Sequence, residues 1–128
     1  MVLNSLGGVY QRQGRSADSL RAFEESKRIG EDLGDNRHLA VVHTSLGRVL
    51  LSRNQPERAA EELRKGFEID ERVKNIRGLT IVTPQFVTAL QKLGRHDEAQ
   101  AVCQRALAVA PHERKLRQLL ERLSSTPP

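Results

Sequence analysis

The sequence predicts an all-α fold built from stacked helical hairpins, and three observations support this prediction. The chain of 128 residues aligns with itself when it is displaced by 40 residues, which is the pattern of a stacked helical repeat. Apolar residues within each copy recur at helical spacing. The composition is 38% hydrophobic but only 3% aromatic, so Leu, Ala and Val must supply most of the core. The positions one period apart include Leu6, Leu46 and Phe86; Gly7, Gly47 and Val87; Gly14, Asn54 and Gly94; and Phe23, Leu63 and Cys103.

Seven helices are expected, joined by connections so short that neighbouring helices must be antiparallel. Gly14 and Gly34 are expected to end the first two helices and Asn54 the third, because these residues tolerate a left-handed backbone. Asp35 can cap the third helix, and Pro56 opens the fourth, where its missing N–H costs nothing. The expected helices span residues 2–13, 17–33, 37–53, 56–74, 76–93, 96–109 and 111–123.

Two prolines bear on the last helices. Pro84 lies in the middle of the fifth expected helix, where a proline removes a backbone hydrogen bond and produces a kink. Alternatively, Thr83 caps a new helix that begins at Pro84. Pro111 is expected to open the last helix, and residues 124–128 are expected to be disordered.

Gly7 and Gly47 lie inside expected helices, where glycine costs about 1 kcal/mol relative to alanine. This cost indicates that two helices approach each other closely at these points, where a larger side chain would block them. Small residues also recur in the second helix of each pair, at Ser19, Ala59 and Ala99, as interdigitated packing requires.

Charge and cysteine content restrict the class of protein. The net charge is +5, but basic and acidic residues are interspersed, so nucleic acid is not expected as a partner. A single cysteine cannot form an internal disulfide, and we expect a cytoplasmic protein. No apolar run is long enough to span a bilayer and the first residues lack the pattern of a signal peptide, so no membrane is expected.

The sequence contains no catalytic pattern, and we do not expect an enzyme, a cofactor or a metal site. The histidines lack metal-ligand spacing with one another. Leu6-Gly7-Gly8 has no lysine of the kind that a phosphate-binding loop needs. Cys103 occupies a repeated core position, which predicts a buried small hydrophobic residue and not a reactive thiol.

The repeated residues resemble the tetratricopeptide repeat (TPR), whose pattern is a large residue, Leu-Gly, Tyr, a Gly turn, Ala, an aromatic residue, Ala and a final Pro. The resemblance covers residues 1–111 as repeats 1–35, 36–75 and 76–111, followed by a capping helix at 112–123, within one domain of residues 1–123. It implies a right-handed superhelix of three antiparallel helix hairpins plus the C-terminal capping helix. The matching residues are Leu3, Leu6, Gly7, Tyr10, Gly14, Ser19, Phe23 and Ser26; His43, Leu46, Gly47, Leu50, Asn54, Ala59, Leu63 and Gly66; and Thr83, Phe86, Val87, Leu90, Gly94, Ala99, Cys103, Ala106 and Pro111.

The period of 40 exceeds the common 34-residue repeat by six residues. The additional residues lie around 30–35 and 70–75 and lengthen the helices by about one and a half turns. The joint Leu33-Gly34-Asp35-Asn36-Arg37 resembles the longer variant found in kinesin light chains, in Leu-Gly-Asn-type scaffold proteins and in the sensor arms of bacterial regulators.

The resemblance implies a non-catalytic protein–protein interaction module that binds a peptide or a partner domain in a concave groove, lined by the first helix of each hairpin. Among the groove positions, Arg12, Arg48 and Lys92 would favour a carboxylate, so we hypothesise an acidic segment as the ligand. The alternative is an ordinary hydrated helix face. The groove residues that the family pattern implies are Asn4, Ser5, Gly8, Gln11, Arg12, Thr44, Ser45, Arg48, Ser52, Gln85, Thr88, Gln91 and Lys92.

Two other functions stay open at this point. One is a sensor or regulatory arm of a bacterial nucleotide-binding switch ATPase or transcription regulator. The other is an RNA-binding helical repeat, but such repeats read bases from fixed positions, and the groove positions differ between the repeats here. Because Met1 falls one residue into the repeat pattern, we expect the first hairpin to be uncapped. We therefore expect the C-terminal part of a larger protein, or a homodimer formed through the uncapped N-terminal end.

Overall fold

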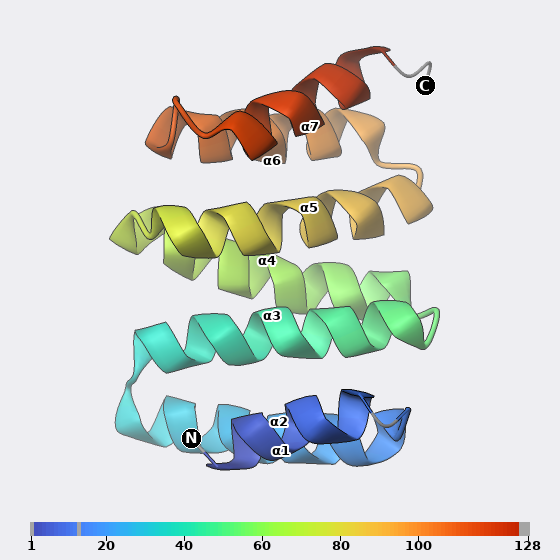
Figure 1. The fold of residues 1–128 in the computed structure, drawn as a ribbon, viewed down its shortest axis with the longest axis vertical. Helices are drawn as coiled ribbons and strands as arrows, with labels where there is room; N and C mark the ends of the chain where they lie inside the picture. The colour runs from blue at the N-terminus through green and yellow to red at the C-terminus, as the bar shows by residue number, and fades with distance from the viewer. Residues whose placement is uncertain (1, 13, 126–128) are drawn as a thin grey trace.

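The computed structural model describes residues 2–12 and 14–125, and the side chains of residues 5–10 and 14–125. This part of the chain consists of helices and short turns, with no strand, as the sequence predicts (Figure 1). Successive helices run antiparallel, and α1 and α7 lie at opposite ends of the stack. The helices are α1 (Val2–Arg12), α2 (Ser16–Leu33), α3 (Asn36–Ser52), α4 (Pro56–Val73), α5 (Ile76–Lys92), α6 (His96–Val109) and α7 (Arg114–Ser125).

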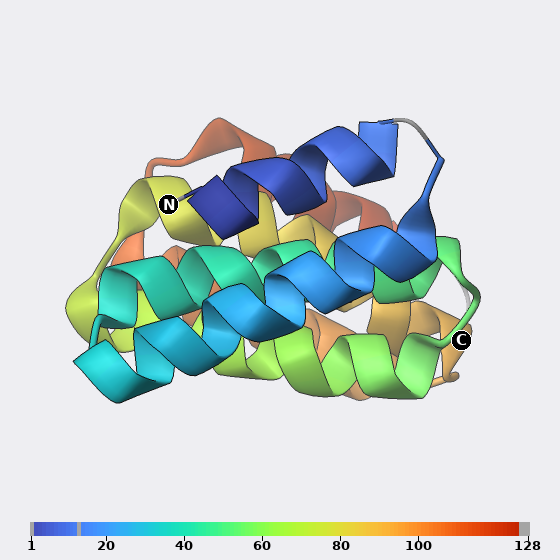
Figure 2. The same ribbon diagram turned by 90° about the horizontal axis from the view of Figure 1, so that it is seen from below.

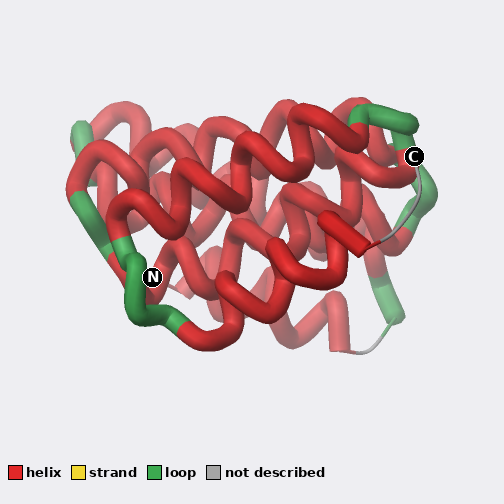
Figure 3. The backbone as a smooth tube through the Cα atoms, turned by 90° about the horizontal axis from the view of Figure 1, so that it is seen from above, coloured by secondary structure: helices red, strands yellow, loops and turns green. Residues whose placement is uncertain are grey.

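The helices form two layers, with the odd-numbered helices in front of the even-numbered ones in Figure 1. Turning the stack by 90° shows the helices one behind another, and the connecting loops gather at the two ends of the helices (Figures 2 and 3). In the odd-numbered layer each helix packs on the next, from α1 to α7. In the other layer the backbones of α4 and α6 approach closely, whereas those of α2 and α4 are farther apart and are joined by the Lys27–Glu62 ion pair at 3.5 Å. The closer spacing places the odd-numbered helices on the inner face of the superhelix.

Each turn between helices from α1 to α6 contains a residue with a left-handed backbone. Gly14, Gly34 and Asn54 have φ angles of 73°, 65° and 58°, which confirms the three predicted helix ends. Lys74, at φ 58°, was not expected there, because a lysine carries the steric cost that glycine avoids. Asp35 caps α3 as predicted, and its carboxylate accepts a hydrogen bond from the His38 N–H at 3.1 Å.

The two helices of each hairpin fit together through pairs of small and large residues. A Cβ added to Gly7 would lie 2.6 Å from the ring of Phe23, and one added to Gly47 would lie 2.3 Å from the side chain of Leu63. The predicted close approach is therefore correct, and the group that needs the space is a side chain of the second helix.

In the third hairpin the same two positions hold Val87 and Cys103, both buried. The larger residue of this pair is on the first helix and the smaller on the second, the reverse of the order in the first two hairpins.

The structure of the fifth helix excludes one of the two interpretations of Pro84. α5 runs without interruption from Ile76 to Lys92 and contains Pro84, so a second helix starting at Pro84 is wrong. Two side chains bond to main-chain carbonyls of this segment. The Thr88 hydroxyl donates to the Pro84 carbonyl at 2.9 Å, and the Gln85 amide donates to the Ile81 carbonyl at 3.3 Å.

The last helix also differs from its prediction. Pro111 does not open it, because residues 110–113 form a turn in which the Glu113 N–H donates to the Ala110 carbonyl at 3.1 Å. α7 begins at Arg114, three residues after the expected start at Pro111, and continues to Ser125, so Ser124 and Ser125 are helical and not disordered. Residues 126–128 lie outside the described residues. The other described helix ends agree with prediction to within one residue.

Candidate functional site

A pocket of about 240 Å³ opens on the inner face between α3 and α5. Its floor is formed by the C-terminal end of α4 and by the turn into α5. The lining residues are Ala40, Val41, Thr44, Ser45 and Arg48 from α3, Asp70 from α4, Asn75 from the turn, and Gly78 and Ile81 from α5.

The rim of this pocket is apolar on two sides. Val41 and Ile81 are 52% and 49% exposed. They lie one period apart in the sequence, so the repeat places them at the same position on α3 and α5. Together with Ala40 they give the pocket walls that can pack against methylene groups of a ligand.

The floor of the pocket carries a buried acid. Asp70 is only 3% exposed, and its carboxylate accepts one hydrogen bond from the Asn75 amide at 3.3 Å. Burial raises the pKa of Asp70 to about 6, and the bond from Asn75 opposes that effect only in part.

The Asp70 side chain has room because the facing position on α5 is a glycine. A Cβ on Gly78 would lie 2.4 Å from one Asp70 carboxylate oxygen and 2.6 Å from the other. The Gly78 N–H is held by Asn75, whose side-chain oxygen accepts from it at 3.1 Å. Asn75 therefore caps α5 and orients Asp70 at the same time.

The α3 side of the pocket is polar. The Thr44 hydroxyl donates to the Ala40 carbonyl at 2.9 Å, so its oxygen can still accept a hydrogen bond from a ligand. Ser45 lies beside it and is 6% exposed. Arg48 is exposed and forms no ion pair with any described residue, so its guanidinium is available to an anionic group.

The structure brings together three of the residues that the family pattern implies for the groove: Thr44, Ser45 and Arg48 all line the pocket. The others do not line it. Ser5, Gly8, Ser52, Gln85, Thr88, Gln91 and Lys92 lie elsewhere on α1, α3 and α5, and the side chains of Asn4, Gln11 and Arg12 lie outside the described residues. Ser52 and Thr88 donate their hydroxyl groups to carbonyls of their own helices.

Five lining residues that matter chemically were not predicted. The 40-residue period could have indicated Val41 and Ile81, which are equivalent positions on inner helices. It also aligns Asn75 with the capping residue Asp35. Nothing in the repeat pattern distinguishes Asp70 and Gly78, because their importance depends on the contact between them.

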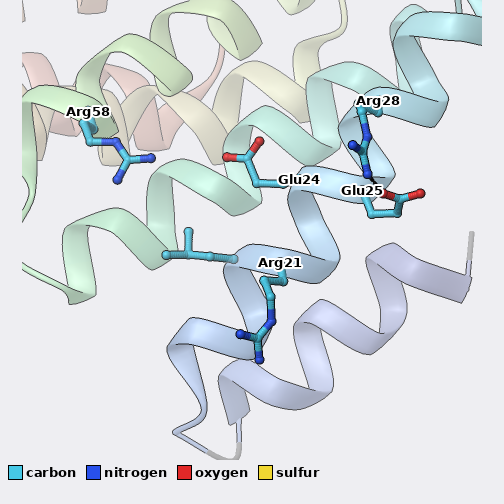
Figure 4. Close-up of a pocket in the computed structure, with 6 residues that line it drawn as sticks. Arg21, Glu24, Glu25, Arg28 and Arg58 are labelled. Carbon is cyan, nitrogen blue, oxygen red and sulfur yellow. Dashed lines mark ion pairs between the residues drawn. The ribbon is translucent and has the colours of Figure 1, made fainter.

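A second pocket, of about 480 Å³, lies in the outer layer where α2 and α4 are apart (Figure 4). Glu24 and Arg58 stand on opposite sides of it, while Glu25 pairs with Arg28 on the same helix. Glu24 also pairs with Lys27 at 3.2 Å. Because its charged groups on α2 are paired within that helix and Arg58 donates to the Gln55 side chain at 2.9 Å, we interpret it as a hydrated outer face and place the candidate site on the inner face.

Other reactive groups are occupied by structural contacts. Cys103 is buried, as predicted, its thiol lies 3.4 Å from the Leu116 carbonyl, and burial raises its pKa to about 11. His43 shares a 2.7 Å hydrogen bond with Glu62. Residues 2–12 and 14–125 contain no group of His, Cys, Asp or Glu side chains arranged to hold a metal ion. In the same residues no helix combines the length and the apolar character that crossing a bilayer requires.

Stacked antiparallel hairpins with a pocketed inner face define a helical-repeat module. The family comparison agrees: tetratricopeptide-repeat models match residues 1–72 and residues 86–113. The chain belongs to the tetratricopeptide-repeat family, a class of non-catalytic protein-binding modules. No curated protein matches the chain.

Several solved structures share the fold. The first TPR domain of Spaghetti (RPAP3), bound to the HSP90 peptide SRMEEVD, matches with a TM-score of 0.71 at 18% identity over 96% of this chain and 90% of that one. The second TPR domain of human RPAP3, in complex with the HSP70 peptide SGPTIEEVD, gives 0.73 at 14% identity over 97% and 93%. The type III secretion translocator chaperone SycD of Yersinia enterocolitica gives 0.68 at 20% identity over 96% and 77%.

Proposed function

We propose that the chain binds an extended segment of a partner protein along its inner face, and that the segment carries an acidic residue. The observation that carries the proposal is the pocket between α3 and α5, with exposed Arg48 at its edge. An extended segment has unpaired backbone groups that hydroxyls such as that of Thr44 can bond. Two of the similar folds are described in complex with peptides that contain adjacent glutamates, which is consistent with this ligand class.

The role of Arg48 follows from its lack of an internal partner. A guanidinium that is free in the unbound protein can form a charge-assisted hydrogen bond with a ligand carboxylate without first breaking an ion pair. Such bonds contribute about 1.5–3 kcal/mol, which corresponds to roughly 10- to 100-fold in the dissociation constant.

The proposal predicts that Arg48→Ala weakens binding of acidic peptides by about 10-fold or more. A peptide array of acidic, neutral and basic segments would identify ligands, and fluorescence anisotropy would give their dissociation constants. Arg117→Ala removes an exposed charge from α7, away from the pocket, and is the matched control with no expected effect. Equal retention of acidic and neutral peptides by the unaltered chain, or indifference to Arg48→Ala, would contradict the acidic preference.

A further inference from the structure

The buried acid at the floor of the pocket has no cation of its own. Asp70 forms no ion pair with any described residue, and its carboxylate accepts one hydrogen bond, from the Asn75 amide. A carboxylate has about four acceptor positions, so most of its capacity is unused. Burying a carboxylate without a cation is unfavourable, and a cationic group brought into the pocket would relieve that cost.

The shape of the pocket selects the kind of cation. Ala40, Val41 and Ile81 form apolar walls above Asp70, and the pocket opens to solvent on the inner face. Lysine and arginine side chains have this distribution of properties, with an apolar stem and a charged end. A bare metal ion would use the apolar walls poorly, and it would meet one carboxylate and no second acidic ligand among the lining residues.

The glycine on α5 is the feature that makes room for the Asp70 carboxylate. Any side chain at Gly78 would collide with the Asp70 carboxylate, since even a Cβ would lie 2.4 Å from it. Because glycine has no side chain, position 78 offers Asp70 no donor, and a cationic partner can come from outside the chain.

We propose that this pocket binds the cationic end of a lysine or arginine side chain of the partner segment, with Asp70 as the anion that receives it. The inference rests on the proposed function, because it assigns a second contact to the same bound segment. Arg48 at the edge and Asp70 at the floor would then select a segment in which a basic residue lies near an acidic one. The raised pKa of Asp70 fits this assignment, since a cation would stabilise the charged form.

The test compares two peptides that differ at one position. An acidic peptide selected on the array is synthesised with lysine, or with the uncharged norleucine, at the position where a basic residue binds best. We expect the lysine peptide to bind about 10-fold more tightly or better.

Asp70→Asn, which keeps the shape of the side chain, should abolish that difference and leave the effect of Arg48→Ala unchanged. Asp97→Asn, an exposed acid on α6, is the control and should change neither. Equal binding of the two peptides, or a lysine preference that survives Asp70→Asn, would overturn the assignment.

A second probe is independent of any peptide. Titration with n-butylammonium should shift the NMR signal of the Gly78 amide, which lies beside Asp70, and Asp70→Asn should remove that shift. If no peptide binds but this shift is present, the proposed function fails and the cation pocket stands. If peptides bind but the shift is absent in the unaltered chain, the cation pocket fails and the proposed function stands.

Discussion

The α2–α3 and α4–α5 junctions have nearly the same backbone but opposite side-chain arrangements. Both contain a left-handed residue, at Gly34 and Lys74. Both capping side chains, Asp35 and Asn75, accept from the N–H three residues later at 3.1 Å. The equivalent main-chain bonds that close the two turns measure 3.0 and 2.9 Å. The 40-residue period therefore reproduces the backbone of the junction closely.

The side chains that fill the two junctions come from opposite helices. In the first, His38 of α3 occupies the space, and Gly30 of α2 leaves room for it, since a Cβ there would lie 2.8 Å from the imidazole. In the second, Asp70 stands at the position of Gly30, and Gly78 stands at the position of His38. Each junction accommodates one side chain and requires a glycine opposite.

The two side chains also differ in whether they find a partner. The His38 ring nitrogen Nε2 lies 2.8 Å from the Ser26 hydroxyl and 3.2 Å from the Ser26 carbonyl. The position equivalent to Ser26 in the next repeat is Gly66, which offers Asp70 no side-chain donor. The same backbone thus gives a filled, internally bonded junction in one place and a pocket with an unpaired acid in the other.

The largest predicted effect comes from placing two side chains in one junction. Gly30→Asp should destabilise the fold by about 2–3 kcal/mol, because His38 already fills the space. His38→Gly should restore part of that loss in the double variant, which then has the residues of the second junction. Urea unfolding of both single variants and the double variant should give a coupling energy of about 1–3 kcal/mol. Additive losses would show that the two positions do not share the space.

Asp70 should make stability depend on pH in a defined direction. The pKa of this carboxyl is raised from 3.8 to about 6 in the folded chain, so the folded state binds the proton more tightly than the unfolded state does. Stability from this group is therefore greatest below pH 4 and is lost as the pH rises through 6, by at most about 3 kcal/mol. Apart from Asp70, the charged residue that lines the pocket is Arg48 of α3. The residues that α5 contributes, Gly78 and Ile81, are uncharged.

Asp70→Asn removes this titration and should be more stable than the unaltered chain at pH 8 by about 1–3 kcal/mol, with the difference falling toward zero near pH 4. Urea unfolding at several pH values measures it. Asp32→Asn, which removes an exposed acid from α2, is the control for the change of net charge. A constant difference between pH 4 and pH 8 would show that the carboxyl of Asp70 is not perturbed in this way.

The smallest predicted effect concerns a buried polar position that recurs one period apart, at His43 of α3 and Thr83 of α5. Lys27, His43 and Glu62 form a polar network, in which Glu62 lies 2.7 Å from His43 and 3.5 Å from Lys27. The position equivalent to His43 one repeat later is Thr83, which is fully buried and has no hydrogen-bond partner among the described residues.

Thr83→Val should therefore stabilise the fold by about 1 kcal/mol, because it removes an unsatisfied hydroxyl and keeps the shape of the side chain. Thr44→Val is the matched comparison. It removes a hydroxyl that donates to the Ala40 carbonyl, so it should cost about 1 kcal/mol. Thermal unfolding measures the change in stability of each variant. Destabilisation by Thr83→Val would show that the Thr83 hydroxyl is hydrogen-bonded in solution.

The sequence was sufficient to predict the fold and part of the site. Turn residues such as Gly34 and Asn54 act through their own backbone preferences, so a repeat pattern can reveal them. Arg48 and Thr44 were predicted because the family pattern assigns them to the inner face. The Asp70–Gly78 pair was not, because it depends on two residues of different helices meeting. The prediction that Pro111 opens the last helix is wrong, because a proline can occupy the turn before a helix as well as its first position.

The most direct measurement of the central proposal is an NMR titration with the acidic, lysine-containing peptide. The pocket between α3 and α5 should respond first, with shifts of the Thr44, Gly78 and Ile81 amides that follow one binding curve. The outer residues Leu20 and Arg58 should not move with them. Arg48→Ala and Asp70→Asn should each displace that curve to higher peptide concentration. Shifts confined to the outer face, or shifts on the inner face that neither substitution alters, would contradict binding through this pocket.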